Sequence, residues 1–69
     1  MIENADQLRR AKRWMQVFRG DARALEAAGP QAGEEPRLLA LEVASLRSQA
    51  ERLEQQIVEY EAQQQQPAV

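Results

Sequence analysis

Cysteine and histidine are both absent from this 69-residue sequence. Without cysteine, neither a disulfide bond nor a thiolate metal site can stabilise the fold. Without histidine, the chain lacks the commonest general base and the commonest metal ligand. The carboxylate pairs Glu34/Glu35 and Glu59/Glu61 would need a cleft to act in catalysis, and a chain this thin offers none. We therefore expect no enzymatic activity, no cofactor and no metal ion.

Long apolar segments are also missing. No uncharged apolar run approaches the roughly 18 residues that a membrane-spanning helix needs. The chain begins Met-Ile-Glu-Asn, with an acidic residue where a signal peptide would carry basic residues before an apolar core. Together with the absence of cysteine, these features predict a cytoplasmic protein without a membrane partner.

Neither sign of charge dominates the sequence. Nine basic and eleven acidic residues give a net charge of −2, which does not indicate nucleic acid as a partner of the whole molecule. The charges are unevenly placed, with six basic and four acidic residues in 1–28 but three basic and seven acidic residues in 29–69. Opposite net charges on the two parts favour an arrangement in which they lie side by side.

Glycine and proline are few, and they gather in the segment 29–36. Gly29 suits the left-handed position just past a helix C-terminus, and Pro30 cannot continue that helix. Pro36 suits the first turn of a second helix, where Glu35 would lie near the positive end of the helix dipole. The segment is therefore expected to be the turn of a hairpin.

The first helix is expected to begin near Asn4, a good N-cap, with Gln7 placed as a capping-box partner. Gly20 is its one weak point. The Gln-rich tail has nothing apolar to bury before Pro67, so we expect it to be flexible. The expected organisation is one helical-hairpin domain over 1–63, with a helix at about 4–28, a turn at 29–35, a helix at 36–63, and a tail at 64–69.

Apolar residues recur at heptad spacing in both expected helices. The first helix carries Leu8, Ala11, Met15, Phe18, Ala22 and Leu25, and the second carries Leu39, Val43, Leu46, Ala50, Leu53, Ile57 and Tyr60. Such spacing over about three heptads is typical of coiled coils. We expect an all-α fold, an antiparallel helical hairpin with coiled-coil-like packing. Its expected core is Leu8, Met15, Phe18, Leu25, Val43, Leu46, Leu53 and Ile57.

Charged residues flank the two apolar series when the chain is folded back about residue 32. The flanking pairs in this register are Lys12 with Glu54, Arg19 with Arg47, and Asp21 with Glu42. The first pair is of opposite charge, but the other two are like-charge pairs, which disfavour an isolated hairpin. A third helix could supply their partners.

Apolar residues outside these series also favour a third helix. Trp14 and Val17 form a second stripe on the first helix, and Leu38 and Leu41 make the start of the second helix apolar on several sides. A helix that is apolar on several sides is normally buried on several sides. We expect these four residues to form an intermolecular face, with two hairpins packed as a four-helix bundle in a two-fold homodimer. A tetramer, or a different protein covering this face, remains an alternative.

Basic residues on the first helix form a possible nucleic-acid face. They are Arg9, Arg10, Arg13, Arg19 and Arg23. Small helical dimers can bind RNA or DNA through such a face by phosphate contacts. The acidic chain as a whole favours a simpler interpretation, a solvated helix surface partly neutralised by Asp6.

The second helix contains a Leu-Arg-Ser-Gln stretch at 46–49 and an Ile-Val-Glu-Tyr-Glu ending at 57–61. It resembles the helical N-terminal segment that precedes the helix-turn-helix domain in bacterial Xre-type regulators and some antitoxins. Ile2, Asn4 and Phe18 fit the same pattern, which covers about 2–62. In those proteins the DNA-binding domain follows the Glu-Tyr-Glu ending, whereas a Gln-rich tail follows here. The resemblance therefore implies dimerisation or partner binding beside a regulator or toxin, and it transfers no DNA-reading residue.

The sequence thus predicts a non-catalytic interaction or oligomerisation module with a regulatory role. The alternative is a small helical dimer that binds RNA or DNA through its arginines. A third possibility is a chain that folds only on a partner, which the long apolar series disfavours.

Overall fold

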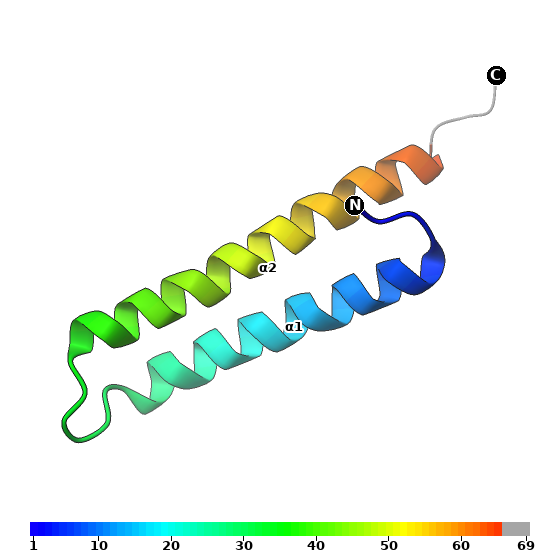
Figure 1. Ribbon diagram of the computed structural model, residues 1–69. Coiled ribbons are helices and arrows are strands. Elements are labelled where there is room, and N and C mark those ends of the chain that lie inside the picture. The colour runs from blue at the N-terminus through cyan, green and yellow to red at the C-terminus, as the bar shows by residue number, and fades with distance from the viewer. Residues whose placement is uncertain (66–69) are drawn as a thin grey trace.

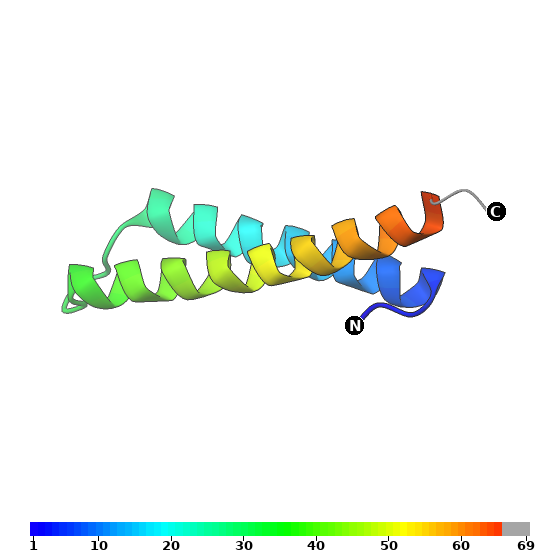
Figure 2. The ribbon, with the colours of Figure 1, turned by 90° about the horizontal axis from the view of Figure 1, so that it is seen from above.

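The computed structural model describes residues 1–65 and consists there of two α-helices without a strand. Helix α1 spans Ala5–Ala28 and helix α2 spans Pro36–Gln65. The helices run antiparallel along their whole length (Figure 1) and cross at a shallow angle (Figure 2). The molecule measures 60 × 17 × 16 Å. The predicted all-helical hairpin is confirmed.

The start of α1 is fixed by its own side chains. Asn4 is the N-cap, and its side-chain oxygen accepts a hydrogen bond of 2.9 Å from the backbone N–H of Gln7. The side chain of Gln7 reaches back and accepts a hydrogen bond of 2.8 Å from the backbone N–H of Glu3. The first bond satisfies an N–H group that a helix start leaves unpaired, and the second ties the residue before the N-cap to the first turn. Helix α1 then continues through Gly20 without a break.

The turn between the helices depends on Gly29, which has a φ of 71°. Its ψ of −179° differs from the left-handed helical conformation that the sequence suggests, although both regions favour glycine. Gly29 donates its N–H to the carbonyl of Leu25 at 3.0 Å and so ends α1. In the loop, the N–H of Glu34 donates to the carbonyl of Gln31 at 2.9 Å. Pro36 is the first residue of α2, as expected.

The second helix is longer than expected. It continues to Gln65, so residues 64 and 65, which the sequence assigns to a flexible tail, are helical. Glutamine is a good helix former and nothing before Pro67 interrupts the helix, which explains the extension. The remainder of the expected tail, 66–69, lies outside the described residues.

The core lies along the single line where the helices meet. One cluster near the turn joins Ala22, Leu39 and Val43, with Leu25 and Leu46 packed against it. A second cluster, at the other end, joins Ile2, Ala11 and Ile57, with Leu8, Met15, Leu53 and Tyr60 packed against it. Ala22 and Ala50 are the most deeply buried residues, at 1% and 2% exposed. Of the eight expected core residues, Val43 and Ile57 are buried and the others are half-buried, because a pair of helices has solvent on both sides of its seam.

Ion pairs on one flank correct the expected charge register. Arg19 pairs with Glu54 at 2.6 Å and not with Arg47, while Lys12 pairs with Glu61 at 3.2 Å and not with Glu54. Each partner on α2 lies one heptad further along than expected. The lean of helical side chains toward the N-terminus of their own helix displaces such a contact by only about one residue on each helix, so the axial position of the two helices accounts for most of the shift.

The third interhelical ion pair follows the same rule. Arg47 pairs with Glu26, so the expected repulsion between Arg19 and Arg47 does not arise. These arginines therefore need no third helix to supply acidic partners. The case for a further helix therefore no longer depends on these two arginines.

Candidate interaction surfaces

The hairpin has two different long sides. All three interhelical ion pairs lie on one of them, which we call the ion-paired side. The opposite side carries Trp14, and we call it the tryptophan side. Around Trp14, one shallow depression is lined by Arg10, Arg13 and Val17 and another by Phe18, Gln49, Arg52 and Leu53.

The tryptophan side exposes large apolar surface near the middle of α1. Trp14 is 54% exposed and Val17 is 39% exposed. The ring of Trp14 stacks on Phe18, with 5.8 Å between the ring centroids. This stacking holds the indole against the hairpin and leaves its other surface open. Exposed Trp beside Arg is typical of residues that dominate the energy of protein interfaces.

The structure does not bring all four expected interface residues onto one side. Leu38 lies eleven residues before Gln49, about three helical turns, so it shares the tryptophan side with Trp14 and Val17. Leu41 instead continues the stripe of Ala44, which lines a groove beside the ion pairs. Both leucines are exposed.

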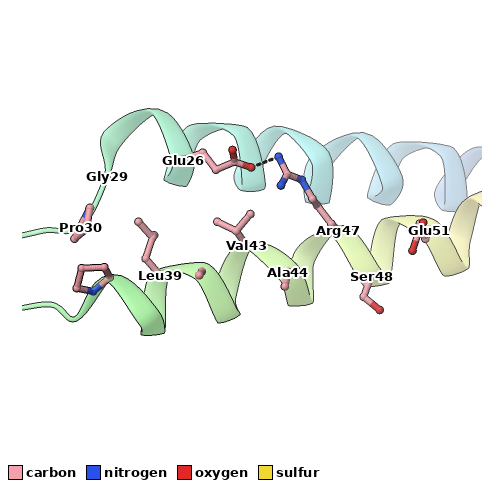
Figure 3. A pocket seen from close by; sticks show the side chains of 11 residues that line it. Glu26, Gly29, Pro30, Leu39, Val43, Ala44, Arg47, Ser48 and Glu51 are labelled. Carbon is pink, nitrogen blue, oxygen red and sulfur yellow. Dashed lines mark ion pairs between the residues drawn. The ribbon is translucent and has the colours of Figure 1, made fainter.

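That groove lies on the ion-paired side near the turn, with a volume of about 750 Å³. Figure 3 shows Leu39 and Val43 at its base and the ion pair of Glu26 with Arg47 across it. Small residues open the groove along α2, because a stripe of Ala40, Ala44 and Ser48 borders it. Its lining offers apolar surface and one satisfied ion pair, a composition suited to packing.

The five arginines of the possible nucleic-acid face are spread around α1. Arg9 pairs with Asp6, and Arg19 pairs with Glu54. Arg23 lines a depression on the ion-paired side together with Arg19, Arg47, Ala50, Glu51 and Glu54. Arg10 and Arg13 lie beside Trp14 on the tryptophan side. The structure therefore divides these residues between surfaces and does not gather them into one basic face.

The described residues offer neither a metal site nor a membrane-spanning helix. Residues 1–65 contain no group of three or more Asp or Glu side chains that could hold a metal ion. Within the same residues, neither helix combines enough length with enough apolar character to span a bilayer. The carboxylate of Glu34 accepts a hydrogen bond from the N–H of Gln31 at 3.3 Å and thus supports the turn.

Sequence reasoning missed two features of these surfaces. Ile2 is buried because the first four residues fold back toward the end of α2 (Figure 1), where Ile2 joins the cluster of Ile57. Its apolar side chain two residues before the N-cap is the only local signal for this contact. Val58 is 59% exposed. It lies four residues after Glu54, so it faces the ion-paired side.

Comparisons with protein-family models, curated proteins and solved structures find no match to the chain.

Proposed function

We propose that the chain is a non-catalytic, cytoplasmic oligomerisation module that joins two hairpins into a four-helix bundle. The observation that carries the proposal is the exposed apolar surface of Trp14, Val17 and Leu38 on the tryptophan side. The hairpin itself buries only one seam, so this surface has no cover among the described residues. Packing two such sides together would bury it in the manner of a helix bundle.

The elongated shape supports the same conclusion. The radius of gyration is 15.9 Å, whereas a compact domain of this length has one of about 11 Å. The chain exposes 5656 Å², about 1,300 Å² more than the ~4,400 Å² of a globular protein of its mass. A standard interface buries about 800 Å² on each partner. The hairpin thus has enough excess surface to form one.

The sequence resemblance extends this proposal, because it suggests that the oligomerisation module has a regulatory role. The segment 46–61 resembles helices that precede DNA-binding domains in Xre-type regulators and some antitoxins. A dimer of hairpins would act there by setting the spacing of the partners that it joins. The basis for this extension is analogy, so it is secondary to the oligomerisation itself.

Sedimentation equilibrium tests the proposal. We expect the purified chain to form a dimer that dissociates on dilution, and we expect Trp14→Ala to weaken the dimer at least tenfold. Val58→Ala is the matched control, since Val58 is similarly exposed but lies on the other side. A chain that stays monomeric at all concentrations would refute the proposal. An unchanged association constant for Trp14→Ala would refute the assignment of the face.

Nucleic-acid binding is a second candidate, favoured by the position of Arg10 and Arg13 beside exposed Trp14. Phosphates could bind the arginines while a base stacks on the indole. Titration of labelled single-stranded RNA and DNA at several salt concentrations tests this function. Salt-sensitive binding that is lost in the double variant Arg10→Ala/Arg13→Ala would establish it, and no binding at low salt would exclude it.

A further inference from the structure

The exposed line of α1 on the tryptophan side has the spacing of a second coiled-coil seam. Its residues are Gln7, Arg10, Trp14, Val17, Asp21 and Ala24, at intervals of 3, 4, 3, 4 and 3. All six are exposed. A 3.5-residue repeat places them in one line along the helix, next to the line that packs on α2. Helix α1 is therefore built to pack on two sides, and α2 covers one of them.

The charges on this line have no partner in the described part of the hairpin. The four ion pairs among residues 1–65 use neither Arg10 nor Asp21. Eleven residues separate Arg10 from Asp21, about 16 Å along the helix axis, so they cannot meet within one helix. Trp14 and Val17 lie between them. Along α1 the line therefore runs from a basic residue through two apolar residues to an acidic one. A second copy running in the opposite direction would place its acidic residue against the basic residue of the first.

We infer that two copies of the chain pack α1 against α1 in antiparallel orientation along this line, which deepens the proposed function and rests on it. The two-fold axis passes between Met15 and Gln16. Trp14 then lies level with Val17 of the partner subunit, and Arg10 lies level with Asp21 of the partner subunit. Each contact occurs twice, because a two-fold interface repeats every pair.

Other alignments of the same line are less favourable. A parallel pair would set Arg10 against Arg10 of the partner subunit and Asp21 against Asp21 of the partner subunit. Among the antiparallel alignments, a shift of one heptad in one direction places Val17 against the partner's Asp21. The opposite shift places Trp14 against the partner's Arg10. The alignment centred between Met15 and Gln16 matches apolar with apolar and basic with acidic residues, and so it is favoured.

The flank of the seam also accommodates a second copy. In this alignment Arg13 lies level with Phe18 of the partner subunit, two residues before the partner's Gly20. A Cβ added to Gly20 would meet nothing within 4 Å in the hairpin, so this position is open. The long side chain of Arg13 can lie across the space and approach the partner's Asp21. Within the line itself no like charges lie level with each other, whereas a parallel pair would set Arg10 level with Arg10 of the partner subunit.

Charge reversal in two different chains tests the orientation. Arg10→Asp would face Asp21 of the partner subunit, and Asp21→Arg would face Arg10 of the partner subunit. Each single variant should therefore lose self-association by about tenfold or more, measured by sedimentation equilibrium. An equimolar mixture of the two should recover dimers, because both repelling pairs become attractive in the heterodimer. The double variant Arg10→Asp/Asp21→Arg should self-associate like the original chain.

A matched control and a folding check complete the experiment. Arg23→Asp makes the same change of charge on the other side of α1 and should leave the dimer unchanged. Far-ultraviolet circular dichroism should show unaltered helicity, because all the substituted positions are exposed. If the original chain dimerises but the mixture binds no better than the single variants, the antiparallel seam is wrong while oligomerisation stands. A monomeric original chain would overturn both.

Discussion

Ile57 and Val58 are neighbours on α2 whose removal should have very different effects. Ile57 is 5% exposed and belongs to the cluster of Ile2 and Ala11, whereas Val58 is 59% exposed on the ion-paired side. Ile57→Ala removes three buried carbon groups, worth about 0.8 kcal/mol each by transfer from water. The cavity adds little, because a thin hairpin can close around it. We therefore expect a loss of about 2–3 kcal/mol.

Thermal and urea unfolding, followed by circular dichroism at equal protein concentrations, measure this difference. For a chain of this length 1 kcal/mol changes Tm by about 4–8 °C, so Ile57→Ala should lower Tm by about 10–20 °C. Val58→Ala should change the stability by less than about 0.5 kcal/mol, as surface substitutions usually do. Repeating both at a tenfold higher concentration separates hairpin stability from association.

Equal losses in the two variants would refute the reasoning. A large loss in Val58→Ala alone would mean that another chain covers the ion-paired side. A small loss in Ile57→Ala alone would mean that the seam near Ile2 is not a cooperative part of the fold.

The remaining expectations concern local structure and charge. Gly29→Ala should destabilise the hairpin by about 1–3 kcal/mol, because the φ of 71° at Gly29 combines with an extended ψ. Gly20→Ala should instead stabilise α1 by about 1 kcal/mol in the same unfolding assay. Equal effects of the two substitutions would contradict this account of the turn. Asn4→Ala should cost about 1 kcal/mol through loss of the N-cap, and Asn4→Asp should retain most of the stability. Glu54→Gln should cost less than about 1 kcal/mol, because its pairing with Arg19 is solvent-exposed, and the difference should vanish in 1 M salt.

Local rules account for the parts of the fold that the sequence predicted correctly. Asn4 caps α1, Gly29 ends it and Pro36 starts α2, because each requires only its own backbone preference or a neighbour three or four residues away. Heptad spacing likewise marks the line of α1 that faces α2, since periodicity along one helix needs no knowledge of the other. The antiparallel hairpin follows from two such helices and a short turn.

Contacts between distant residues were predicted less well. The sequence placed Lys12 beside Glu54, yet Lys12 reaches Glu61, because the axial position of α2 against α1 differs from the expected one. The exposed apolar residues were identified by type, but Leu41 lies beside the groove and away from Trp14. A small rotation of a helix about its axis decides which side of the hairpin such a residue faces. The local sequence does not show this rotation for apolar residues at the edge of the seam.

What the sequence by itself determined is therefore the two helices, their ends at the turn and the N-cap of the first, their antiparallel pairing and the apolar seam between them. Tertiary structure alone decided which charges pair across the seam, that Ile2 folds back onto the end of α2, and which side of the hairpin carries Trp14. The physical reason is the distance along the chain over which each effect acts. Backbone preferences and periodicity act within a few turns of one helix, whereas side-chain partners across two helices depend on their relative rotation and axial position, which only packing sets.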